Sequence, residues 1–422
     1  MIRRLAFSSL VLAATFGGFF LAPAAVQLLA SPGSEDGAEA PDFEPRAVTA
    51  EEHQFLGWPP AWGPMAPVTA LLSPQPFAQA LERFGAQDVM EVRRPRRWLR
   101  RAPPQAVDKP IGTFSASGAL NSDIYANPNL RGVLIRTSWA SVEPRPDVFD
   151  FSAIALQAAN VESHGLPWSL AVAGGGVGSP AWLTDPPVFG GLGVPYISYS
   201  FRGQPGYRLP LFWNPIVQDR LRMLAAALAA QFSQDPNLKL VYVTQMTANG
   251  IEGHLQGVDM ADLIEAGYSD ALWIQACETA ARSFAYAFAS KAIAFEVHEV
   301  NGSAAVPARI INDLWNDPSL GHRVGAAMWW ISGKVSYQPD LIAELMAYPG
   351  DIYGQVIGRS DQTTRFENGD YTTVFTQAMA LGMRYIEAWE YEFKYGPEGA
   401  NGAWDSVFAS YNAWADGTFG SR

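Results

Sequence analysis

Cysteine and histidine, two residue types that often bind metals, are scarce in this chain of 422 residues. Cys277 is the only cysteine, so the chain can form no internal disulfide and no cysteine-rich metal site. The five histidines form neither an H-E-x-x-H nor an H-x-H pattern, which argues against a zinc centre. We therefore expect no metal and no cofactor. The weak alternative is a Ca²⁺ or Zn²⁺ site in GIEGHLQGVDM, with Glu252, His254 and Asp259 as ligands.

Positive charge is also scarce. The chain has 29 Lys and Arg against 41 Asp and Glu, a formal net charge of -12. Because phosphate-binding surfaces need many basic residues, we expect no nucleic-acid or anionic-membrane partner, and a neutral ligand is favoured. Apolar residues make up 48% of the chain and charged residues 17%, which excludes a disordered protein. Fourteen tryptophans are more than a core usually needs.

The N-terminus has the pattern of an export signal. Arg3 and Arg4 precede the apolar run LAFSSLVLAATFGGFFLAPAAV, and small residues suited to cleavage follow. We expect residues 1–30 to be a signal peptide and the protein to be secreted or periplasmic. The alternative is an uncleaved membrane anchor, because the run is long enough to span a bilayer. Residues 31–105 are expected to be a linker and N-terminal extension, acidic at first and basic in RRPRRWLRR. The sequence indicates no oligomeric state.

From residue 106 the chain alternates between short apolar, strand-like runs and helical patterns. Eight such runs are present: IGTFSA from 111, GVLIRTSW from 132, PWSLAVAGG from 167, LVYVTQM from 240, AIAFEVHE from 292, VGAAMWWI from 324, DIYGQVIG from 351 and RYIEAWEY from 384. The helical patterns between them include FSAIALQAANVESHG, VQDRLRMLAAALAAQFS, ALWIQACETAARSFAYAFAS and TTVFTQAMALG. We therefore predict that residues 106–422 form a (β/α)8 TIM barrel, an α/β fold. The excess over roughly 250 residues is expected in the loops after strands three and four.

The stretch RTSWASVEPRPDVFDF, residues 136–151, and the P-x-W-L that follows resemble glycoside hydrolase clan A enzymes, especially family 42 β-galactosidases. Those enzymes carry W-x-x-x-E-P-x-x-G-x-(F/Y)-D-F, and this chain departs from it by lacking the glycine. The matching residues are Trp139, Glu143, Pro144, Phe149, Asp150, Phe151, Gly165, Leu170, Pro180, Trp182 and Leu183. The resemblance implies a barrel that binds an oligosaccharide or polysaccharide and cleaves a glycosidic bond.

Strand alternation places Leu134, Arg136 and Ser138 inside the barrel if Val133 and Ile135 face the helices. A buried arginine needs carboxylates or a polar ligand, because a lone buried charge is costly. Arg136 is therefore expected to hold a catalytic carboxylate, or alternatively to form a plain structural ion pair.

Tryptophans near the strand ends are expected to offer ring faces to a sugar, although a tryptophan can equally be core. The candidates are Trp139, Trp182, Trp213, Trp329 and Trp389. Glu143 is expected to be structural.

Glycoside cleavage needs two carboxyl groups, one protonated and one ionised. The resemblance places the acid after strand four, in an Asn-Glu pair. Glu252 is the only carboxylate in TQMTANGIEGHL, so we predict that it is the acid, with Asn249 three residues earlier in place of the adjacent asparagine. The alternative is a loop glutamate without a special role.

The second carboxylate is less directly indicated. The resemblance places a nucleophilic glutamate at the end of strand seven, but DIYGQVIGRSDQTT has no glutamate, and Asp361 is its carboxylate near the strand end. In RYIEAWEYEF, alternation sends Glu387 inward, so we predict Glu387 as nucleophile. Glu390 is the alternate if the register is shifted by one residue.

In AIAFEVHEV the same rule sends Glu296 and His298 inward, with Glu299 near the strand end. These residues are expected to contact the substrate, or alternatively to form a structural polar network with Arg136. Two functions follow: an exported glycoside hydrolase or transglycosylase, and a non-catalytic barrel that binds saccharide through its tryptophans.

Overall fold

The computed structural model describes residues 107–118, 120 and 122–420. Predictions for residues 1–105, the signal peptide and the linker, lie outside the described residues. Within the described part, no helix is both long and apolar enough to cross a membrane.

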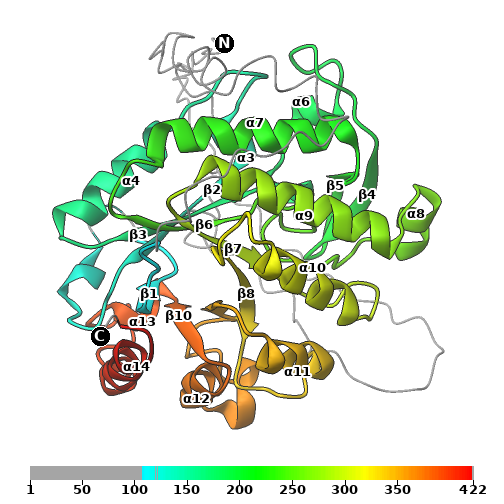
Figure 1. Ribbon diagram of the computed structural model, residues 1–422. Helices are drawn as coiled ribbons and strands as arrows, with labels where there is room; N and C mark the ends of the chain where they lie inside the picture. The colour runs from blue at the N-terminus through cyan, green and yellow to red at the C-terminus, as the bar shows by residue number, and fades with distance from the viewer. Residues whose placement is uncertain (1–106, 119, 121, 421–422) are drawn as a thin grey trace, which may run out of the picture. The chain divides into compact units, whose positions relative to one another are not determined.

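Eight parallel strands close into a barrel, which confirms the predicted fold (Figure 1). They are β1 (Gly112–Ser115), β2 (Val133–Ser138), β3 (Trp168–Ala173), β6 (Leu238–Tyr242), β7 (Ala292–Glu296), β8 (Val324–Ile331), β9 (Ile352–Val356) and β10 (Met383–Ala388). Each of the eight apolar runs becomes one of these strands. Neighbours in sequence are neighbours in the barrel, and β1 pairs with β10 to close it.

The two faces of the strands form two separate apolar clusters. Val133 and Ile135 of β2 pack outward against the helices, whereas Leu134 belongs to the cluster inside the barrel. On β10, Ile386 packs outward and Tyr385 inward. The predicted alternation is therefore confirmed on both strands, and it carries Arg136 and Glu387 into the barrel interior.

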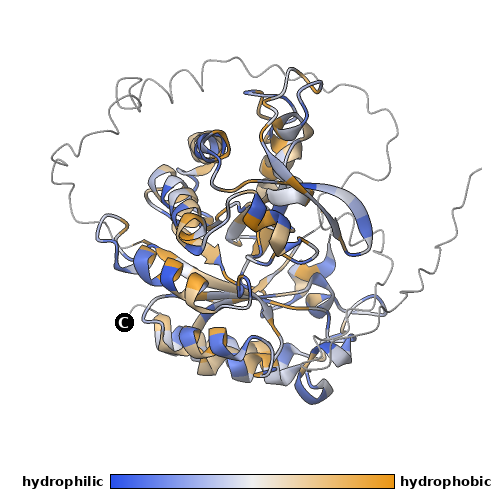
Figure 2. Cartoon of the chain, turned by 90° about the vertical axis from the view of Figure 1, so that its right-hand side faces the viewer, coloured by the Kyte–Doolittle hydropathy of each residue, from blue (hydrophilic) through white to orange (hydrophobic). Residues whose placement is uncertain are grey.

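Helices cover the outside of the barrel. The longer ones are α4 (Ser152–Ser163), α7 (Pro215–Phe232), α9 (Asp270–Ala287), α10 (Ala305–Asn316), α11 (Pro339–Ala347), α12 (Thr372–Ala380) and α14 (Asp405–Phe419). Their apolar residues pack on the strands and their polar residues face outward, so blue and orange mark different sides of the helices in Figure 2. Four of the seven follow the helical patterns recognised in the sequence.

Short elements occupy the loops. They are η1 (Asp123–Ala126), α3 (Trp139–Val142), α5 (Gly175–Gly178), α6 (Ala181–Thr184), α8 (Met260–Glu265), η2 (Thr363–Arg365), η3 (Glu367–Gly369) and α13 (Glu390–Phe393). An antiparallel hairpin, β4 (Tyr196–Phe201) and β5 (Gln204–Pro210), is inserted after β3. The extra length therefore lies after strands three and four, as predicted. These loops follow the carboxyl ends of the strands, where TIM-barrel enzymes carry their active sites.

Candidate active site

The carboxylate of Glu387 lies inside the barrel among three side-chain donors. The hydroxyl groups of Tyr242 and Tyr385 donate to one oxygen over 2.8 and 2.5 Å, and the amide of Gln355 donates to the other over 2.5 Å. Burial raises the pKa of Glu387 to about 7, although these hydrogen bonds and the charge of Arg136 act in the opposite direction.

Arg136 lies above this group and is linked to it through Gln355. Its guanidinium donates to the Gln355 side-chain oxygen over 2.9 Å and lies 4.4 Å from the centre of the Trp329 ring. Burial lowers the pKa of Arg136 to about 10, so the group remains a cation at neutral pH. The predicted inward arginine is thus found beside a carboxylate, with Gln355 as the bridge.

The predicted nucleophilic role of Glu387 is not supported by its surroundings. The residue has 0% of its surface exposed, and both carboxylate oxygens already accept hydrogen bonds. A sugar carbon cannot reach it unless Gln355 moves. Gln355 lies in β9, directly beside Glu387 in the register, on the strand where the resemblance implies a glutamate. The sequence reasoning missed Gln355, although its inward position on strand seven could have identified it.

Glu252 lies on the loop after β6, the fourth strand of the barrel, and is half-buried. The amide of Asn249 donates to its carboxylate over 2.6 Å, while the Asn249 side-chain oxygen accepts from the backbone N–H of Glu252 over 2.9 Å. The three-residue spacing therefore still brings the asparagine side chain onto the glutamate. Glu252 is thus a carboxylate of the predicted pair with surface available to a ligand.

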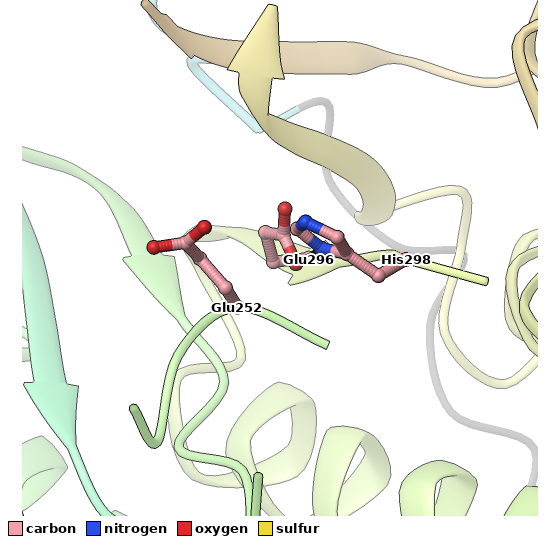
Figure 3. A group of neighbouring side chains, drawn as sticks. All are labelled: Glu252, Glu296 and His298. Atoms are coloured by element: carbon pink, nitrogen blue, oxygen red, sulfur yellow. Dashed lines mark hydrogen bonds and ion pairs between the residues drawn. The ribbon is translucent and has the colours of Figure 1, made fainter. Parts of the chain in front are cut away.

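Glu296 and His298 lie beside Glu252 (Figure 3). Glu296 accepts hydrogen bonds from the backbone N–H groups of Trp329 and Gly253, over 3.0 and 2.5 Å, and lies 3.1 Å from Nδ1 of His298. The side chain of Glu296 is 0% exposed and that of His298 is 6% exposed. Both side chains therefore lie beneath the surface of the site and offer little area to a ligand. Glu296 and His298 thus contact each other as the polar-network alternative expects, but the contact that leads to Arg136 is the face of the Trp329 ring and not a hydrogen bond.

A metal ion is poorly suited to this group. One ligand atom each from Glu252, Glu296 and His298 lies within 4.8 Å of the others. However, both oxygens of Glu296 already accept backbone hydrogen bonds, which a cation would have to displace. Asp259, the third ligand of the alternative site, instead caps α8 by accepting from Ala261 over 2.8 Å.

The charges around Glu252 and Glu296 separate their pKa values. Burial raises the pKa of Glu296 well above its usual range, and the charge of Glu252 adds to this shift. Burial opposes ionisation of Glu252 too, but His254, His298, Arg202 and the Asn249 hydrogen bond outweigh it and lower its pKa. Burial also lowers the pKa of both histidines to about 4, so both are neutral at pH 7. Arg202 and Arg136 are the cations that still interact with the ionised form of Glu252 at that pH.

Trp139 and Trp182 are core residues, which corrects the prediction that they stack on a sugar. They are 0% and 1% exposed. The indole N–H of Trp139 donates to the buried carboxylate of Glu143 over 2.7 Å, and that of Trp182 donates to the Glu143 carbonyl over 3.0 Å. The same carboxylate pairs with Arg220 of α7 and accepts from the backbone N–H of Asp147 over 2.9 Å. Glu143 is therefore structural, as predicted.

The other three tryptophans differ in exposure. Trp329 is 3% exposed and lies under the guanidinium of Arg136, so it supports the site. Trp213, after β5, and Trp389, at the end of β10, are half-buried. The indole N–H of Trp389 donates to the carbonyl of Val356 over 2.8 Å, which fixes the ring between the ends of β9 and β10. These two rings remain candidates for sugar contact.

Two of the alternate carboxylates, Glu390 and Asp361, are otherwise engaged. Glu390 begins α13 and accepts from the hydroxyl groups of Ser117 and Ser122 over 2.9 and 2.6 Å. Asp361 pairs with Arg359 over 2.7 Å. Glu299 is half-buried near the end of β7.

A hollow of about 520 Å³ lies over the loops after β8 and β9. It contains none of the predicted catalytic residues. Its lining consists of Lys334, Ser336, Thr363, Thr364, Phe366, Glu367, Asn368 and Gly369. Since the hollow holds none of the predicted catalytic carboxylates, we place the site at Glu252.

No protein-family model and no curated protein matches this chain. Among solved structures, the catalytic domain of a β-amylase from Paenibacillus polymyxa is similar, with a TM-score of 0.51 and 11% identity, covering 72% of this chain and 98% of that one. An endoglucanase from Pseudomonas stutzeri has a TM-score of 0.45 and 11% identity, covering 72% and 97%. Endo-glycoceramidase II from Rhodococcus sp. has a TM-score of 0.43 and 15% identity, covering 70% and 77%. At 11% identity, the likeness to the β-amylase domain shows a shared barrel fold and no more.

Proposed function

We propose that this chain is an exported glycoside hydrolase of a β-linked oligosaccharide or polysaccharide, with Glu252 as general acid and base. The observation that carries the proposal is the half-buried Glu252 carboxylate after the fourth strand, held by the Asn249 amide at 2.6 Å. This is the place that the resemblance to clan A, and to family 42 in residues 136–183, gives to the acid. Export rests on the signal-like pattern of residues 1–30.

In this mechanism Glu252 gives its proton to the glycosidic oxygen as the bond from the sugar carbon to that oxygen breaks. The second carboxylate stabilises or attacks the positive sugar carbon, and water completes hydrolysis. Glu387 can take this part only after the Gln355 amide swings off its oxygen. In the free protein the pKa of Glu252 is lowered, so substrate binding has to favour its protonated form.

A second candidate function is saccharide binding without catalysis. It is favoured by the complete burial of Glu387 and by Gln355 in the seventh strand. In that case Glu387 would serve only to hold Gln355 and Arg136, and the half-buried rings of Trp213 and Trp389 would bind the sugar.

Glu252→Gln separates these functions, because it keeps the shape of the side chain but removes the proton. If Glu252 is the acid, kcat on substrates with poor leaving groups should fall by about 10² to 10⁴-fold. The loss should be smaller on activated aryl glycosides, which need little protonation. A wild-type rate in the variant would remove the acid assignment. Saccharide binding without turnover in the wild type would favour the second function.

A further inference from the structure

The tip of the β4–β5 hairpin places an arginine over the loop that carries Glu252. Arg202 lies at the turn with a φ of 49°, and its side chain is exposed. Its guanidinium is 5.1 Å from the centre of the Phe201 ring, and this ring stacks on His254 at 5.7 Å with an interplanar angle of 26°. The tip is therefore held to the Glu252 loop by stacked rings.

A second contact fixes the hairpin on the same loop. Gly257 has a φ of 80°, and a side-chain carbon placed there would lie 1.8 Å from the carbonyl oxygen of Ser200. Only a glycine allows the two backbones to approach so closely. Packing at both Ser200 and Phe201 thus fixes the hairpin tip, and Arg202 with it, on the loop that carries Glu252.

Within the part of the chain that the structure describes, the guanidinium of Arg202 forms no ion pair, whereas Arg208 on the same hairpin pairs with Asp185 at 3.4 Å. Arg136, the other arginine near Glu252, is already bonded to Gln355. A planar guanidinium presents paired donors that match the oxygens of a carboxylate or a sulfate.

We propose that Arg202 binds an anionic substituent of the substrate, the carboxylate of a uronic acid or a sulfate ester, on a sugar beside Glu252. This inference rests on the proposed function and names its substrate class. The net charge of -12 disfavours a broad anionic ligand surface, but a single substituent needs only one cation. Pairing with such a substituent also offsets one of the charges that lower the pKa of Glu252, the others including His254 and His298.

The test compares Arg202→Gln with Arg202→Lys, and uses Arg208→Gln as the matched control on the same hairpin. The ratio of kcat/KM for aryl uronides to kcat/KM for neutral aryl glycosides with the same leaving group is measured for each protein. Loss of a charged hydrogen bond predicts a fall of about 10- to 100-fold in this ratio for Arg202→Gln. Arg202→Lys should retain part of the preference, and Arg208→Gln should keep the wild-type ratio. An unchanged ratio in Arg202→Gln would overturn the proposal.

A binding arm keeps the test independent of turnover. Calorimetric titration compares two proteins, the single variant Glu252→Gln and the double variant that also carries Arg202→Gln. Each is titrated with three series of oligosaccharides, which contain a uronic acid, a sulfate ester or only neutral sugars. Tighter binding of one anionic series, lost with Arg202, supports the proposal and identifies the group. Equal affinity for all three series overturns it. If the wild-type protein cleaves none of these compounds but shows the anionic preference in binding, the proposed hydrolase fails while the arginine site stands.

Discussion

Arg220 is the clearest place to test how the loop after β2 is held. This residue of α7 pairs with Glu143, whose carboxylate is 0% exposed, and reaches Asp147 over 2.7 Å. Arg220→Ala would leave the Glu143 carboxylate buried without its cation. Removing one partner of a buried pair typically costs about 3 to 5 kcal/mol. Arg222→Ala is the control, because Arg222 lies on the same helix but pairs with Asp219 at 3.4 Å with 45% of its side chain exposed.

For a domain of roughly 300 residues, this cost corresponds to a fall of about 5 to 8 °C in melting temperature. Differential scanning calorimetry of both variants at pH 7 measures it. We expect a shift of this size for Arg220→Ala, with less than about 1 kcal/mol lost in Arg222→Ala, since exposed ion pairs contribute little. Equal, small shifts in the two variants would show that the Glu143 carboxylate does not need Arg220, and the ion-pair account of this loop would have to be abandoned.

Three further predictions concern the site and the domain limits. The pKa of Glu387 is raised to about 7 in the folded protein. The folded state is therefore favoured when Glu387 is protonated, and this contribution to stability is lost as the pH rises through 7. The melting temperature of the wild type relative to Glu387→Gln should therefore fall between pH 4.5 and 8, and a pH-independent difference would contradict the shift. Trp389→Ala should weaken saccharide binding in titration calorimetry with the fold intact, whereas Trp182→Ala should lower the melting temperature because its ring is core; unchanged affinity in Trp389→Ala would remove the stacking role. A chain shortened to begin at Asp108 should keep the melting temperature of the full chain, and aggregation would show that the preceding residues belong to the domain.

The barrel was predictable because every strand is a short apolar run followed by a helical pattern. For the strands that begin near residues 132 and 384, the inward-facing and outward-facing residues were also predicted correctly. Successive side chains of a strand point to opposite faces even where both faces are buried. The hairpin of β4 and β5 was not predicted. Strand β5 mixes glycine, proline and exposed polar residues in QPGYRLP, so no apolar alternation marks it. Strand β4 does alternate between buried and exposed residues in YISYSF, and this signal was missed.

The site was predictable in position but less so in accessibility. Glu252 and Asn249 were located by their place after the fourth strand, and the structure brings their side chains together. The burial of each side chain was harder to predict. A sequence does not show whether the carboxylate of an inward-facing glutamate reaches the open end of the barrel or lies beneath it. Glu387 lies beneath, covered by Gln355. Trp139 and Trp182 were misjudged for the same reason, as a tryptophan beside a strand end packs equally well behind the loop.

The closure of the barrel bears on how the chain is made. β1 pairs with β10, and Asn412 of α14 accepts from the backbone N–H of Thr113 over 2.8 Å, across 299 positions of sequence. A ribosome delivers Thr113 long before Asn412, so the first strand lacks its second neighbour until β10 has emerged. Contacts of such long range form slowly and expose unpaired strand edges meanwhile. The barrel therefore closes only after β10 and α14 have been synthesised. A nascent chain interrupted before that point would expose the unpaired edge of β1 to other chains.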